Sequence, residues 1–233
     1  MRLYIIRHAD PDYPNNTITA AGHLEAQALA GRLEGEGLTR IYVSPLGRAL
    51  HTMQYTADRA GLEHTVQDWV KEISGFGVDD EVFGHVAAWN VPGEIIRRRP
   101  LPGLESWHKR APFDNPEFLK VYDEVRRNSD EFLAGLGYRR KDGSYRITAG
   151  NRERIAVFCH AGFGLTWLAH LLDLPLTMVW SGFFLAPSSV TTVLFDERSD
   201  TAATPRCLAV GDTSHLHAAG LPIQPAGIVA NYD

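Results

Sequence analysis

Short apolar strands and amphipathic helices alternate over the first seventy residues, and this alternation constrains the fold more than any other sequence feature. Apolar runs at 3–6 and 41–43, rich in β-branched and aromatic residues, predict buried strands. Between them, Thr19 is suited to cap a helix over 20–34, whose apolar residues recur every three to four positions. A second helix and a strand around 65–67 complete a β-α-β-α-β pattern. Such a pattern predicts parallel strands joined by right-handed crossovers.

The rest of the chain continues the same fold class. Three further strands are expected, at 155–159, 190–195 and 207–210. The first of these is a continuous apolar run, as in a strand buried on both faces of a sheet. An apolar helix follows it, whereas the tail after Gly211 is expected to be a loop. We therefore predict an α/β fold, a three-layer α/β/α sandwich with a mostly parallel central sheet and helices on both faces.

One long segment, 73–153, interrupts this pattern and is expected to be a substrate-selecting insertion in a single domain over 1–233. Its first part, up to Arg110, is rich in glycine and proline and predicts irregular structure over the C-terminal edge of the sheet. Asn115 then suits the start of a long helix, and a polar hairpin or loop follows it. The arginine run 97–99 is more typical of a solvated charge run than of a substrate clamp, and both interpretations stay open.

The composition of the chain limits the classes of partner that it can be expected to bind. The chain of 233 residues is 44% apolar and 22% charged, which is ordinary for a soluble globular protein. No apolar run approaches the roughly 20 residues that span a bilayer, and a net charge of −5 argues against a general nucleic-acid binder. We therefore expect neither a membrane nor a nucleic-acid partner. The first strand begins at Arg2, without a preceding signal peptide, and only two cysteines occur, so we expect a cytoplasmic location. The sequence indicates no oligomeric state.

Basic side chains stand where three predicted strands end. Arg7 and His8 end the first strand, Arg48 lies one turn into the helix after the second, and His160 ends the strand at 155–159. Because the carboxyl ends of parallel strands meet at one edge of a sheet, we expect these side chains to converge. Guanidiniums can bind phosphate in bidentate fashion. A neutral imidazole can attack phosphorus when its other ring nitrogen is held as N–H.

An acid is needed to protonate the leaving alkoxide of a phosphate ester. Glu72 follows the third predicted strand at the same edge and fits this role, with Asp79 and Glu81 as alternatives. Backbone N–H groups at 162–164 and at the start of the second helix are expected to face an anion.

Two further histidine arrangements need an interpretation. His215 and His217 would bind a metal only with a third partner, and none stands at a useful spacing, although His215 could line the site. Cys159 beside His160 suggests a Cys-His pair, but neighbouring residues of a strand point to opposite faces, which excludes it.

Four segments resemble motifs of the histidine phosphatase superfamily, the phosphoglycerate-mutase-like fold. Arg7-His8-Ala9 resembles its R-H-G signature, and 19–28 resembles L-T-x-x-G-x-x-Q-A with the last two residues one place late. Residues 44–52 are similar to S-x-L-x-R-A-x-x-T, and 157–162 to V-x-H-G-G. The segments follow one another in the family's order and leave the insertion uncovered.

The resemblance implies a role for each matching residue. His8 would be the nucleophile that forms a phosphohistidine, which water then hydrolyses. Arg7, Arg48 and His160 would form the phosphate pocket, and Glu72 would be the proton donor and later the base. No metal and no cofactor are implied, because the arginines and His160 supply the charge. The expected partner is a small phosphorylated substrate, with inorganic phosphate or vanadate as ligands.

Two departures from the family's mutases indicate a phosphatase. The mutases follow R-H-G with E-S and an asparagine, whereas this chain has Asp10 and then Pro11, which lacks a hydroxyl; Asn15 or Asn16 could supply the amide. Their E-R-x-Y-G around the acid is replaced by 72–76, without the arginine and tyrosine. We therefore expect a metal-independent phosphatase acting on a phosphomonoester. The alternatives are a phosphoglycerate-type mutase and a non-catalytic phosphate-binding module.

Overall fold

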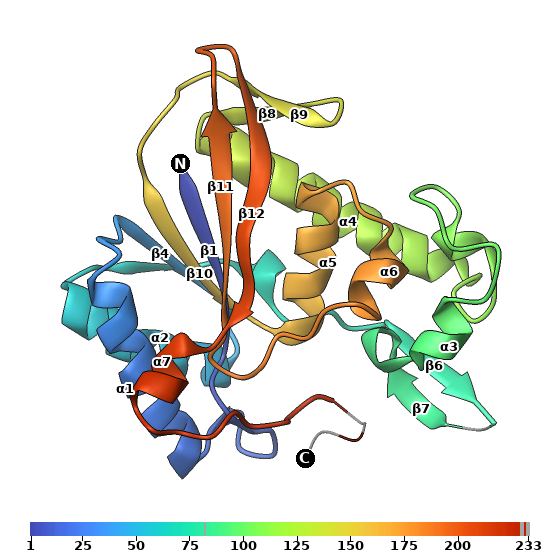
Figure 1. Cartoon of the computed structure of the whole chain (residues 1–233), viewed down its shortest axis with the longest axis horizontal. Helices are drawn as coiled ribbons and strands as arrows, with labels where there is room; N and C mark the ends of the chain where they lie inside the picture. The colour runs from blue at the N-terminus through green and yellow to red at the C-terminus, as the bar shows by residue number, and fades with distance from the viewer. Residues whose placement is uncertain (82, 229–230, 232–233) are drawn as a thin grey trace.

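The computed structural model describes residues 1–81, 83–228 and 231. The central sheet consists of β1 (Arg2–Arg7), β4 (Arg40–Val43), β5 (His64–Val66), β8 (Tyr138–Lys141), β9 (Ser144–Ile147), β10 (Arg154–Cys159), β11 (Val190–Glu197) and β12 (Ala202–Asp212). Its strand order is β5-β4-β10-β1-β11-β12-β9-β8 (Figure 1). The first four strands of this order are parallel, and the remaining pairings are antiparallel. The predicted α/β fold is confirmed. The sheet is mixed rather than mostly parallel, because β11, β12, β9 and β8 pair antiparallel. The parallel half contains the ends of β1, β4 and β10, where site residues are predicted.

Helices cover both faces of the sheet. They are α1 (Ala20–Glu34), α2 (Gly47–Ala60), α3 (Gly93–Ile96), α4 (Pro116–Gly135), α5 (Ala161–Leu171), α6 (Leu176–Trp180) and α7 (Ser214–Ala218). Alternating residues of β1 explain the layers, since successive side chains of a strand face opposite ways. Leu3 and Ile5 pack with α4 and α5, whereas Tyr4 and Ile6 pack with α1 and α2. The sheet is thus buried on both sides, as its continuous apolar runs predict.

The cap of α1 is the predicted one. The Thr19 hydroxyl accepts a hydrogen bond from the backbone N–H of Gly22 at 3.1 Å, and it donates to Asp10 Oδ2 at 2.7 Å. Residues 11–18 between β1 and α1 form a tight hairpin of β2 (Pro11–Asp12) and β3 (Thr17–Ile18). This hairpin holds the turn after His8 against the starts of α1 and α2.

The segment before Arg110 contains more regular structure than predicted. It includes the hairpin of β6 (Gly77–Asp80) and β7 (Gly84–Ala87), the short helix α3 and brief 3-10 turns. These elements are three or four residues long, too short for periodicity to reveal them. The helix expected after Asn115 is confirmed as α4, and the polar hairpin is confirmed as β8 and β9, which extend the central sheet. The tail expected to be a loop contains α7.

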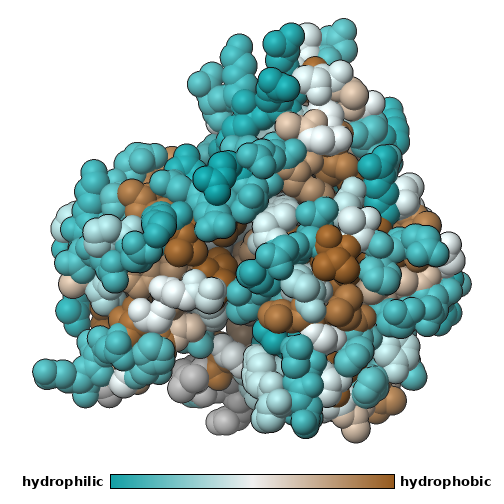
Figure 2. Space-filling model, turned by 180° about the vertical axis from the view of Figure 1, so that it is seen from behind, coloured by the Kyte–Doolittle hydropathy of each residue, from teal (hydrophilic) through white to brown (hydrophobic). Residues whose placement is uncertain are grey.

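An aromatic cluster joins the insertion to the rest of the molecule. Phe76, Trp107, Phe118 and Trp180 are buried together and pack on Leu165 of α5. Figure 1 shows α3, β6 and β7 on one side of the sheet's carboxyl edge and α1, α2 and α7 on the other, with the C-terminal tail between them. On the reverse face, apolar side chains form several separate groups divided by hydrophilic ones (Figure 2). None of the described helices has the length and apolar character to cross a bilayer.

Candidate active site

His8 is the first residue beyond β1, and the backbone fixes it from two sides. Its N–H donates to the Cys159 carbonyl at 3.0 Å, and its carbonyl accepts from the Ser188 N–H at 3.0 Å. The imidazole Nδ1 lies 2.7 Å from the carbonyl oxygen of Ala9. A carbonyl can only accept a hydrogen bond, so Nδ1 carries the proton and Nε2 keeps a free lone pair. Burial and the neighbouring Arg7 hold the pKa of His8 well below its usual value, which keeps the ring neutral.

His160 faces His8 from the end of β10. Their ring centroids are 5.1 Å apart, and His160 Nε2 lies 2.8 Å from the hydroxyl oxygen of Ser44. Burial, and then the proximity of His8 and Arg48, lowers the pKa of His160 well below its usual value. Its Nδ1 is buried without a hydrogen-bond partner among the described residues. A neutral ring with an unused nitrogen beside the nucleophile can contact an incoming ligand.

Arg7 is 2% exposed although it carries a charge. One terminal nitrogen donates to the carbonyl of Leu185 at 2.6 Å. Burial lowers the pKa of Arg7, and attraction to Tyr13 and Glu72 opposes this change. The C-terminal tail passes over the same guanidinium: a Cβ on Gly227, whose φ is +90°, would lie 3.1 Å from Arg7 Nη2. The close approach and the left-handed backbone both favour glycine there.

Arg48 lies in the first turn of α2 and reaches the hairpin that follows β1. Its guanidinium donates to Asn16 Oδ1 at 3.3 Å, and its central carbon is 5.4 Å from the centre of the Tyr13 ring. Gly47 permits this contact, because a Cβ there would lie 2.2 Å from the Asn16 carbonyl oxygen. Tyr13 also meets the His8 ring edge-on, with centroids 6.4 Å apart. Arg7, His8, Arg48 and His160 are thus brought together, as the sequence predicts.

The Glu72 carboxylate occupies the N-terminus of α5. Its Oε1 accepts from the N–H groups of Phe163 at 2.8 Å and Ile73 at 3.1 Å, and its Oε2 accepts from the Gly162 N–H at 3.2 Å. The N–H groups expected to face a phosphate therefore hold this carboxylate in the structure. Burial raises the pKa of Glu72, while the three N–H groups and Arg7 oppose the rise. A carboxyl with a raised pKa can hold a proton for donation.

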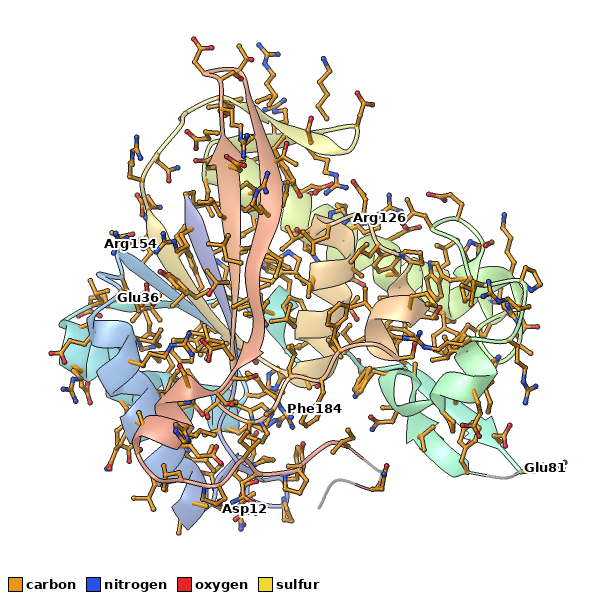
Figure 3. All side chains as sticks on the ribbon, in the orientation of Figure 1. Asp12, Glu36, Glu81, Arg126, Arg154 and Phe184 are labelled. Carbon is orange, nitrogen blue, oxygen red and sulfur yellow. The ribbon has the colours of Figure 1, made fainter. Side chains whose placement is uncertain are left out.

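The two alternatives to Glu72 lie elsewhere. Asp79 is on the exposed β6–β7 hairpin, where its carboxylate is 2.7 Å from His85 Nδ1. Glu81 lies at the outer tip of the insertion, away from the strand ends (Figure 3). Neither is near Arg7, whereas Glu72 interacts with it. The geometry therefore favours Glu72 as the acid.

His215 lies behind the site rather than in it. It is buried, and its Nε2 is 3.0 Å from the hydroxyl of Ser188, whose N–H donates to the His8 carbonyl. His217 is exposed on α7, and no cluster of three potential metal ligands exists in the described part of the chain. The run 97–99 is exposed, with one guanidinium nitrogen of Arg97 at 3.4 Å from the Ser181 carbonyl.

Two residues of the site, Tyr13 and Glu25, are not assigned to it from the sequence. Tyr13, 56% exposed, contacts the His8 ring and the Arg48 guanidinium, yet in the sequence it is one of many aromatic residues. Glu25 is 2% exposed, and its Oε2 accepts from the Asp10 N–H at 2.9 Å. Burial raises the pKa of Glu25 to about 7. Nothing in the sequence separates Glu25 from the other polar residues of its helix, because only the packing of α1 on the β1 turn buries it.

Comparison with known proteins identifies the family. The profile of the histidine phosphatase superfamily (branch 1) matches residues 3–206. The chain belongs to this superfamily. The match includes all five predicted site residues and the insertion, which the motifs alone left uncovered.

The individual relatives that follow have low sequence identity to this chain. A probable phosphoglycerate mutase, GpmB, from Yersinia enterocolitica is 24% identical, and the match covers 93% of this chain and 95% of that protein. A phosphoserine phosphatase mutant from Entamoeba histolytica, solved with phosphoserine, has 22% identity and a TM-score of 0.61 over 92% of this chain and 98% of its own. A mycobacterial glucosyl-3-phosphoglycerate phosphatase has 18% identity and a TM-score of 0.57, and the match covers 90% of this chain and 98% of that protein. The structural likenesses establish the shared fold.

Proposed function

We propose that this histidine phosphatase hydrolyses a small phosphomonoester through a phosphohistidine formed on His8. The observation that carries the proposal is the Nδ1 contact with the Ala9 carbonyl, which leaves Nε2 unprotonated beside Arg7 and Arg48. Phosphoryl transfer depends mainly on positioning and on positive charge around the transferring group. The neutral nucleophile and the two guanidiniums meet both requirements.

The reaction has two steps. In the first, His8 Nε2 bonds to phosphorus while the bond to the ester oxygen breaks, and Glu72 gives its proton to the departing alkoxide. Arg7, Arg48 and His160 stabilise the charge on the three phosphoryl oxygens. In the second step, the Glu72 carboxylate takes a proton from water, the hydroxide attacks phosphorus, and inorganic phosphate leaves with the electron pair returning to His8. No metal or cofactor enters this scheme.

The relatives support a small phosphorylated substrate. The Entamoeba histolytica phosphatase was solved with phosphoserine and with 3-phosphoglyceric acid, and the mycobacterial one with inorganic phosphate. For this chain we propose inorganic phosphate and vanadate as ligands of the same pocket. We also propose a single domain in which 73–153 selects the substrate. The cytoplasmic location stays a prediction; Cys159 and Cys207 are free thiols.

A mutase is the second candidate, because the Yersinia enterocolitica relative is a probable one. Pro11 argues against it, since this residue pairs with Ile18 in the β2–β3 hairpin and offers no hydroxyl to a phosphate. At the position of the mutases' arginine, Ile73 packs with apolar side chains. An isomerisation assay with and without bisphosphoglycerate distinguishes the two candidates: we expect phosphate release and no mutase activity.

The His8→Ala variant tests the proposal. We expect it to fold, to bind vanadate more weakly and to lose turnover, whereas His64→Ala, an exposed histidine on β5, should behave as the parent protein. Turnover that persists without His8 would refute the phosphohistidine. A parent protein that binds phosphate but hydrolyses no phosphomonoester would favour the non-catalytic module.

A further inference from the structure

We infer that the alcohol part of the substrate binds in an apolar cavity next to the phosphate pocket and is a compact aromatic alcohol. This inference rests on the proposed phosphatase activity and adds the substrate class. The cavity measures about 240 Å³. Its apolar walls are Trp89, Leu165, Trp180, Phe183, Leu185 and Ile228.

The cavity and the phosphate pocket share three walls. Ala161 lines the cavity and directly follows His160. Leu185 lines it too, and its carbonyl accepts the hydrogen bond from Arg7. Gly227 lines it and approaches the Arg7 guanidinium. A phosphate held by Arg7 and His160 would therefore place its ester oxygen at the mouth of this cavity, and Figure 3 shows the adjoining Phe184 below the strand ends.

The walls favour a flat apolar group over a polyol. The Trp89 ring lies flat on Gly162, since a Cβ there would be 2.6 Å from three atoms of its six-membered ring. Asn90 is the main polar side chain of the lining, and within the described residues neither its amide nor the Trp89 N–H has a hydrogen-bond partner. An aromatic ring gains from burial against such walls, whereas the several hydroxyls of a polyol would lose more hydrogen bonds than these two groups replace.

Two substrates and one pair of variants test the inference. Benzyl phosphate and glycerol 1-phosphate both release a primary alkoxide, so they differ mainly in the group that enters the cavity. We expect the kcat/KM of the parent to be at least about tenfold higher for benzyl phosphate, the scale of discrimination that apolar pockets achieve. Phe183→Ser removes an apolar wall that is 41% exposed, so the core stays intact, and it should reduce this ratio about fivefold. Leu208→Ser, at a residue 50% exposed on β12, should leave the ratio unchanged.

The outcomes separate this inference from the proposed function. Hydrolysis of both substrates with equal kcat/KM, or a Phe183→Ser variant with an unchanged ratio, would overturn the aromatic subsite and leave the phosphatase standing. If the parent protein binds no vanadate and releases phosphate from neither substrate, the proposed function itself is refuted. A general loss of activity in Phe183→Ser, with the same ratio, would indicate a structural wall only and would count against the subsite.

Discussion

Replacement of Glu72 by glutamine separates its chemical role from its structural one. The glutamine oxygen can keep the hydrogen bonds from Phe163 and Ile73, but its NH₂ group then faces the Gly162 N–H, which loses its acceptor. One unsatisfied N–H costs about 1–3 kcal/mol of stability. The loss of acid catalysis is larger: about 10²- to 10⁴-fold in rate. We therefore expect a folded protein with a modest loss of stability and a severe loss of turnover.

The assay compares two leaving groups. An alkyl phosphate such as benzyl phosphate needs a proton on its departing oxygen, whereas 4-nitrophenolate leaves unprotonated. The Glu72→Gln variant should thus lose about 10² or more in kcat/KM for benzyl phosphate and much less for 4-nitrophenyl phosphate. Equal losses for both substrates would refute the role of Glu72 as proton donor. Glu72 and Glu124 both line a surface pocket between α4 and the segment after β5. Glu124→Gln, at an exposed carboxylate, is therefore the matched control and should leave both values unchanged.

The pH profile gives a second test of the same residue. Burial raises the pKa of Glu72, and only the protonated carboxyl can donate, so the kcat/KM of the parent should fall as the pH rises through this raised pKa. The Glu72→Gln variant should lack this alkaline fall. His8 should stay a competent nucleophile into the acidic range, because its pKa is well below the usual value.

Three other changes have defined expectations. Because the pKa of Glu25 is raised from 4.5 to about 7, this residue stabilises the folded protein fully below about pH 4.5, and the stabilisation is lost as the pH rises through 7. In urea unfolding, the free energy of unfolding of the parent should therefore fall by about 2–3 kcal/mol between about pH 5 and pH 8, and Glu25→Gln should not show this fall. Gly162→Ala would drive a Cβ into the Trp89 ring and should reduce kcat at least about tenfold. Gly31→Ala on α1 is the control: its Cβ would only make an ordinary contact with Arg59 Nη1 at 3.8 Å, so it should raise the melting temperature. Tyr13→Ala should raise the vanadate Kd about two- to fivefold, because the contact between the Arg48 guanidinium and the Tyr13 ring is lost. Tyr13→Phe should retain that contact, so equal Kd values for the two variants would contradict this role.

The sequence predicts the part of the site that follows from topology. Arg7, His8 and His160 stand at ends of parallel strands, and the sheet brings such ends to one edge whatever lies between them in sequence. The same reasoning places Arg48, because α2 begins where β4 ends. These predictions needed only the order of strands and helices.

Contacts made by irregular segments could not be predicted. Tyr13 reaches the site because the β2–β3 hairpin folds back on α2, and Gly227 reaches it because the tail crosses between the two sides of the molecule. The buried state of Glu25 depends on how α1 packs against the turn after β1. Each of these follows from tertiary packing that local periodicity does not encode.

The most direct test of the account is the identity of the phosphorylated residue. Rapid mixing with an excess of substrate, an alkaline quench that preserves phosphohistidine and peptide mass analysis should find one phosphoryl group on the peptide that contains His8. This phosphoryl group should be absent from His8→Ala. It should accumulate in a variant whose second step is slowed, such as Glu72→Gln with 4-nitrophenyl phosphate. Turnover without any phosphorylated peptide, or a phosphoryl group on His160 instead, would contradict the account.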